Sequence, residues 1–202
     1  MARPTARVDV PRPPFWFKLS IRMGNLLQVD GLILGCALLI AAAHTHTAAA
    51  WRVLLMIAGW LGLYFNSHAL AHWLIGRLGR IRFAGYGVRG TDHPEVYPPG
   101  LRQALSSVPM VTAITDEASL RKARPWARAL MFAAGETATA LVGLLAGLYA
   151  WISGAPGGVF LFGFAAALTL AGVLINSRIP KGDYVKARMA LARPGRHGGR
   201  HG

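Results

Sequence analysis

The sequence predicts an all-α, polytopic integral membrane protein with about four transmembrane helices and with both termini in the cytoplasm. Three observations support this. Hydrophobic residues make up 53% of the 202 positions, and the mean hydropathy is +0.38. The apolar residues gather in four long runs, and the basic residues lie almost entirely in alternate connections between those runs. High hydropathy with only 15% charged residues excludes a disordered chain and is unusual for a soluble domain.

Each of the four apolar runs predicts a membrane-spanning helix, because each approaches the roughly 20 residues that cross a bilayer. The first run has Asp30 near its start, and this carboxylate must lie at an interface or be paired. The lipid bilayer is therefore the first expected partner, with a cytoplasmic loop over 77–125. The predicted spans cover about 26–43, 50–76, 126–152 and 158–177.

The distribution of Lys and Arg predicts the orientation. Of the 22 basic residues, 21 lie in the segments 1–25, 77–128 and 178–202, and the exception is Arg52. Basic connections stay in the cytoplasm, so these three segments are expected there. We expect a multi-pass protein of the plasma (inner) membrane of a prokaryote. The net charge of +14 does not predict a nucleic-acid partner, since no nucleic-acid-binding motif accompanies it.

Three regions are expected along the chain. Residues 1–25 form a basic cytoplasmic segment with interfacial aromatic residues around Trp16, residues 26–192 form the membrane domain, and residues 193–202 form a disordered basic tail.

Within the central loop, the alternation of apolar residues around Phe83 and Tyr86 predicts a small extended or hairpin element at the membrane surface. The prolines between Thr91 and Leu120 predict turns or short pieces.

Two histidines inside the second span predict a metal site. His68 and His72 are spaced i, i+4, which puts both imidazoles on one helix face about 5–6 Å apart at Cβ. This spacing suits two ligands of one tetrahedral ion, most simply zinc, with Asp183 or Glu136 as a third ligand. Ionisable groups inside membranes are costly and usually functional. The alternative is a metal-free scaffold whose histidines only pack within the bundle.

Three short motifs resemble those of one family. They are His68-Ala69-Leu70-Ala71-His72, then Ala134-Gly135-Glu136-Thr137-Ala138-Thr139, then Asn176-Ser177-Arg178-Ile179-Pro180-Lys181-Gly182-Asp183. In order and spacing, over about residues 50–190, they are similar to the motifs of the site-2 proteases, which are intramembrane zinc metalloproteases. The resemblance implies zinc held by His68, His72 and Asp183, and a membrane helix or peptide as substrate or partner.

The departures from that family change the expected activity. Its first motif is His-Glu-x-x-His, whose Glu acts as general base, and here that position is Ala69. The second motif has lost its Pro and Asn, and in the third Gly182 stands before Asp183 rather than after it. We therefore expect impaired proteolysis, as in a pseudoprotease or an inactivated variant.

Glu136 provides the alternative of an active but atypical intramembrane zinc metalloprotease. It lies roughly 13 Å inside its span, matching the roughly 12 Å of His68. It shares a stripe of small residues with Gly143 and Gly147, which would point the carboxylate into the bundle. Glu136 could then be a relocated catalytic base, a metal ligand or a hydrogen-bond partner, and the last two are favoured because a base needs accurate placement. The simplest alternative is a neutral Glu136 bonded to a neighbouring helix.

Overall fold

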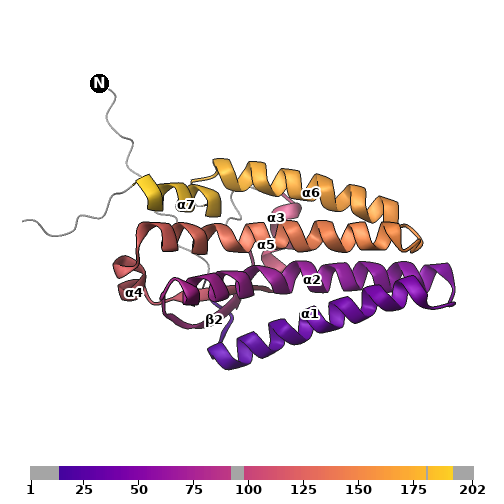
Figure 1. Cartoon of the computed structure of the whole chain (residues 1–202), viewed down its shortest axis with the longest axis horizontal. Helices are drawn as coiled ribbons and strands as arrows, with labels where there is room; N and C mark the ends of the chain where they lie inside the picture. The colour runs from indigo at the N-terminus through magenta and orange to yellow at the C-terminus, as the bar shows by residue number, and fades with distance from the viewer. Residues whose placement is uncertain (1–13, 92–97, 181, 193–202) are drawn as a thin grey trace, which may run out of the picture.

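The computed structural model describes residues 14–91, 98–180 and 182–192, and four long helices form its body (Figure 1). All four are long and apolar enough to cross a membrane, which confirms the predicted fold class. The expected tail 193–202 and most of the expected N-terminal segment lie outside the described residues. The four helices are α1 (Ile21–His44), α2 (Ala49–Leu78), α5 (Pro125–Ile152) and α6 (Gly158–Arg178).

The four helices lie side by side in the order α1, α2, α5, α6, with α2 and α5 in the middle (Figure 1). Glycines permit the close approach of α1 and α2: a Cβ on Gly35 would lie 2.9 Å from the carbonyl oxygen of Gly59. Across the central pair, the indole Nε1 of Trp60 donates to the carbonyl of Gly143 at 3.0 Å. Small residues thus set the helix spacing, as is usual inside membranes.

The end of the bundle that carries the short connections also holds Arg52. Its Nε donates to the carbonyl of Ala42 at 2.8 Å, and its Nη2 donates to the carbonyl of Ala43 at 3.0 Å. These carbonyls belong to the last turn of α1, where no helical donor remains. The one basic residue outside the three basic segments therefore caps a neighbouring helix.

A three-stranded antiparallel sheet covers the opposite end. Its strands are β1 (Phe17–Leu19), β2 (Phe83–Arg89) and β3 (Met110–Thr115), in the order β1-β2-β3. The expected extended element corresponds to β2, whereas β1 falls in the segment expected only to be an aromatic interfacial anchor. The ring of Tyr86 in β2 lies against Gly24 of α1, where a Cβ would leave no room. This contact ties the sheet to the bundle.

Short pieces fill the proline-rich part of the loop, as the prolines predict: α3 (Leu101–Ser107), β3 and α4 (Glu117–Lys122). After α6 the chain turns at Gly182, whose N–H donates to the carbonyl of Ile179 at 2.9 Å. A further helix, α7 (Asp183–Ala192), then packs along α5 (Figure 1). No apolar run in the sequence predicts α7, whose first residue is Asp183.

Candidate metal centre

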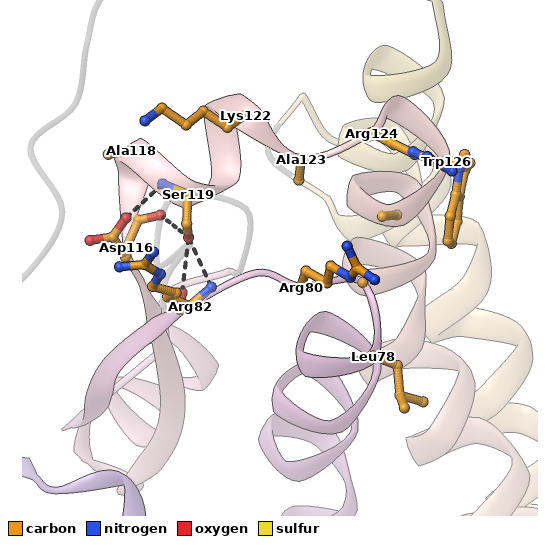
Figure 2. Close-up of a pocket in the computed structure, with 12 residues that line it drawn as sticks. Leu78, Arg80, Arg82, Asp116, Ala118, Ser119, Lys122, Ala123, Arg124 and Trp126 are labelled. Atoms are coloured by element: carbon orange, nitrogen blue, oxygen red, sulfur yellow. Dashed lines mark hydrogen bonds between the residues drawn. The ribbon is translucent and has the colours of Figure 1, made fainter.

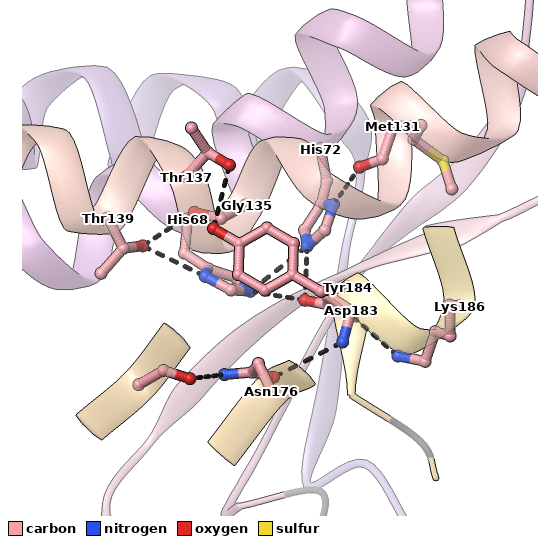
Figure 3. Close-up of polar contacts among 11 residues, drawn as sticks. His68, His72, Met131, Gly135, Thr137, Thr139, Asn176, Asp183, Tyr184 and Lys186 are labelled. Atoms are coloured by element: carbon pink, nitrogen blue, oxygen red, sulfur yellow. Dashed lines mark hydrogen bonds and ion pairs between the residues drawn. The ribbon is translucent and has the colours of Figure 1, made fainter. Parts of the chain in front are cut away.

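Three side chains from two distant parts of the chain converge on one another (Figure 3). His68 and His72 lie on α2, and Asp183 begins α7. Their ligand atoms all lie within 4.8 Å of one another, so the group could hold a metal ion. The turn at Gly182 is what brings the carboxylate back to the histidines.

The separations of the ligand atoms suit a small tetrahedral ion. The two histidine Nε2 atoms are 3.2 Å apart. Oδ2 of Asp183 lies 3.4 Å from Nε2 of His72 and 3.7 Å from Nε2 of His68. Two atoms that each bind a tetrahedral zinc ion at its usual bond length are about 3.3 Å apart. The three atoms therefore form a triangle of the size that one zinc ion requires.

The neighbouring helix α5 orients the ring of His72. Nδ1 of His72 lies 2.6 Å from the carbonyl oxygen of Met131, which can only accept a hydrogen bond, so Nδ1 is the donor. Gly135, one turn further along α5, makes room for the ring, because a Cβ there would overlap Nε2 of His72. The Nδ1 proton leaves Nε2 of His72 with a free electron pair.

A hydroxyl group on α5 orients His68 in the same way. The hydroxyl of Thr139 donates to the carbonyl of Gly135 at 3.0 Å, so its oxygen accepts from Nδ1 of His68 at 3.1 Å. Both histidines thus carry their proton on Nδ1, an assignment that follows from the hydrogen-bond network. Metal-binding histidines are commonly held by such partners on the second ring nitrogen.

This arrangement brings three electron-pair donors together. Both Nε2 atoms and Oδ2 of Asp183 present lone pairs toward a common point, and without a cation they would repel one another. A proton on one Nε2 could be shared with one neighbouring lone pair, whereas one metal ion could accept all three. The hydrogen-bond pattern therefore fits a cation-binding centre better than a packed pair of histidines.

Asp183 is held by its own set of contacts (Figure 3). Its backbone N–H donates to Oδ1 of Asn176 at 3.4 Å, and Nζ of Lys186 lies 2.8 Å from its Oδ1. Burial alone would raise the pKa of the Asp183 carboxyl, but its interactions with His72, Lys186 and His68 lower the pKa below its ordinary value. Asp183 is therefore a carboxylate, with Oδ1 paired and Oδ2 facing the histidines.

The centre is open on one side. The side chain of His68 is 35% exposed, whereas those of His72 and Asp183 are 16% and 14% exposed. Catalytic zinc sites use three protein ligands and keep a fourth position open, while structural sites are closed by four. Three converging ligands with an open flank leave room for a further ligand on a bound ion.

Glu136 lies beside this centre and outside the group of three. Its Oε1 would be 2.6 Å from a Cβ on Gly172, so the carboxylate lies against α6. It interacts with the side chain of Asn176, and its charge interacts with Asp183 and His72. The Glu136 carboxylate points into the bundle, as expected, but it faces α6. Glu136 therefore lies beside the metal centre without being one of its three ligands.

The position next to His68 holds no proton-transfer group. Ala69 has 0% exposed surface, so the space beside it on α2 is filled. A carboxylate at position 69 would have to displace packed neighbours.

Sequence reasoning missed the supporting residues. Thr139 and the carbonyl of Met131 lie on α5, and their role depends on how α5 is rotated and shifted against α2. The presence of Thr139 and Gly135 in the second motif was the available indication. The carbonyl of Met131 has no sequence signature.

No family model matches the chain, and neither the curated proteins nor the solved structures provide a match.

Proposed function

We propose that this protein is a site-2-protease-like membrane protein that holds zinc with His68, His72 and Asp183 and binds a membrane helix or peptide without cutting it. The observation that carries the proposal is the convergence of three ligand atoms in an open centre. The centre has alanine where the family has its base.

The donor set supports zinc as the ion. Two imidazole nitrogens and one carboxylate oxygen are suitable zinc ligands, and the separations of 3.2, 3.4 and 3.7 Å fit its bond lengths. When bound, the ion would supply Lewis-acid chemistry by polarising a peptide carbonyl and lowering the pKa of water. Lys186 and Asn176 would hold the carboxylate in place for this role.

The missing base supports the loss of cleavage. Peptide hydrolysis needs a proton acceptor for the attacking water and a proton donor for the leaving amine. Such help contributes about 10²–10⁴-fold to rate, and the methyl group of Ala69 can give none. What remains is a centre that can bind a carbonyl group and an open flank beside His68.

A second candidate function is an active but atypical metalloprotease that uses Glu136 as base. The observation in its favour is that the charge of Glu136 interacts with both Asp183 and His72. Its carboxylate, however, is directed at Gly172 and Asn176 of α6.

Cleavage of a model substrate with one transmembrane helix tests the proposal. The full-length protein, with zinc bound, should show no cleavage. Ala69→Glu restores the carboxylate but has to displace the neighbours packed against Ala69, so it should raise cleavage above background by at most about 10²-fold, the lower end of what general acid–base help provides. Ala69→Gln is the matched control, because it introduces the same bulk into the filled space without a base, and it should leave the protein inactive.

Two results would contradict the proposal. Cleavage by the unmodified protein that is abolished by Glu136→Gln, with zinc retained, would make Glu136 the base and the protein an enzyme. A protein that contains no zinc after expression and purification in zinc-containing medium would be a metal-free membrane scaffold.

A further inference from the structure

A cavity of about 620 Å³ lies where α2 ends and α5 begins, and none of the three residues of the metal centre lines it (Figure 2). It is lined by the segment that leaves α2, by α4, and by the beginning of α5. Four cationic side chains line it, against a single carboxylate. They are Arg80, Arg82, Lys122 and Arg124.

The one carboxylate does not neutralise the cavity. Oδ1 of Asp116 accepts from the N–H of Ser119 at 2.6 Å and so caps α4. This backbone hydrogen bond lowers the pKa of Asp116, and its charge interacts with Arg82. Among the described carboxylates, none forms an ion pair with Arg80, Lys122 or Arg124. The cavity therefore keeps a net positive charge that its own residues leave uncompensated.

The ends of two candidate spans place the cavity at the level of the lipid headgroups. Leu78 ends α2 with 72% of its surface exposed, and Trp126 stands in the first turn of α5 with 49% exposed. Both line the cavity. Tryptophan is enriched at membrane–water interfaces, and an exposed leucine at the end of a span is expected to face lipid. The mouth of the cavity thus opens where phosphate groups of lipids lie.

The backbone also favours an anion here. α5 begins at Pro125 without a side-chain cap, and Trp126 and Ala127 of its first turn line the cavity, so no capping side chain accepts from the first N–H groups of this helix. Arg80 adopts a left-handed conformation with φ of 61°, one residue after Gly79. That conformation favours glycine. The chain therefore accepts backbone strain at a position whose side chain lines the cavity.

We infer that this cavity binds the phosphate of an anionic lipid headgroup in the leaflet that faces the sheet end of the bundle. Arg80 and Arg82 on the segment after α2, and Lys122 and Arg124 before α5, all line the cavity (Figure 2), so cations from both segments can reach a phosphate bound in it. Trp126 and Leu78 contact the glycerol and the first acyl carbons. If the predicted orientation holds, this is the cytoplasmic leaflet, which carries anionic lipids.

Binding of single lipids to the full-length protein tests the inference. Phosphatidylglycerol is titrated into protein in a neutral detergent, and native mass spectrometry measures the first bound lipid, with zwitterionic phosphatidylcholine as the comparison that has no net charge. Arg80→Gln with Arg82→Gln should weaken the first phosphatidylglycerol at least about tenfold, since each cation near an anionic surface contributes substantially. The matched control, Arg77→Gln with Arg121→Gln, removes two exposed cations that lie outside the cavity, and it should change binding less than about threefold.

Lys122→Gln with Arg124→Gln, before α5, gives a second pair in case the first pair does not fold. Equal losses in the cavity pair and the control pair would overturn the inference, because binding would then be diffuse surface attraction. A second experiment asks whether inorganic phosphate binds to the same cavity. If millimolar phosphate competes with phosphatidylglycerol and raises Tm as much as the lipid does, the site recognises a soluble phosphate and the lipid assignment is wrong. The inference is supported if phosphate does not compete with phosphatidylglycerol and if only the cavity pairs of substitutions weaken binding of the lipid.

Discussion

Two carboxylates lie near the histidine pair, and their surroundings differ. Asp183 begins α7 and directs Oδ2 at both Nε2 atoms, at 3.4 and 3.7 Å. Glu136 lies in the middle of α5 and directs its carboxylate at Gly172 of α6. Both carboxylates lie near the histidines, so their depth in the membrane does not decide which of them can bind the ion. The direction in which each helix presents its side chain decides it.

Asn176 connects the two regions. Its Oδ1 accepts from the N–H of Asp183 at 3.4 Å, and its Nδ2 donates to the carbonyl of Gly172 at 3.2 Å. Its side chain also interacts with Glu136. Glu136 therefore interacts with Asn176 and lies outside the group of three ligands, and the two carboxylates have separate roles that mutations can distinguish.

The largest effect is expected from Gly135→Ala, which fills the space that His72 occupies. A Cβ there would overlap Nε2 of His72, so the ring must leave the centre and metal binding should fall to background. Gly143→Ala on the same helix is the control, because its nearest contact would be an ordinary 3.4 Å. Elemental analysis of both purified variants checks this; zinc retained in Gly135→Ala would mean that His72 is not a ligand.

A smaller effect is expected from Thr139→Val, which removes the hydroxyl that holds Nδ1 of His68 but keeps the shape of the side chain. Loss of such a supporting partner typically weakens metal affinity about 10–100-fold. Thr137→Val is the control, since the hydroxyl of Thr137 bonds to Tyr184 and not to a ligand. Competition with a fluorescent zinc chelator measures both affinities, and equal values in the two variants would contradict the role given to Thr139.

The smallest effect is expected from Gly172→Ala on the Glu136 side. A Cβ would lie 2.6 Å from Oε1 of Glu136, so the carboxylate must shift, at a cost of about 1 kcal/mol in the free energy of unfolding. Zinc content should not change, because Glu136 is not a ligand. Gly163→Ala in the same helix meets nothing within 4 Å and should be neutral. Thermal unfolding with metal analysis measures both, and zinc loss in Gly172→Ala alone would bring Glu136 into the centre.

Sequence alone predicts the parts of this picture that depend on local periodicity. Helix geometry dictates that residues four apart share a face, so His68 and His72 could be paired before any fold was known. The four spans follow from their length and hydropathy in the same way. Asp183 was reached through the resemblance of the motif at 176–183, because nothing local indicates that the chain turns back after α6.

The direction of Glu136 could not be predicted, because depth and a stripe of small residues do not say which neighbour α5 presents that face to. Gly143 of the same stripe meets Tyr64 of α2, whereas Gly147 meets Phe162 of α6. The stripe runs between two neighbours, and only the packed structure shows that the Glu136 end lies on the α6 side. The sheet strand β1 was missed for a related reason: its pairing partner β2 lies more than 60 residues away.

Metal stoichiometry in two matched carboxamide variants tests the central claim most directly. Full-length protein, Asp183→Asn and Glu136→Gln are expressed in zinc-containing medium, purified without chelators, and measured for zinc per chain. We expect about one zinc ion per chain in the unmodified protein and in Glu136→Gln, and a loss to background in Asp183→Asn, because among the described residues only Asp183 provides a carboxylate oxygen to the group. Zinc absent from the unmodified protein, or lost in Glu136→Gln and kept in Asp183→Asn, would contradict the account.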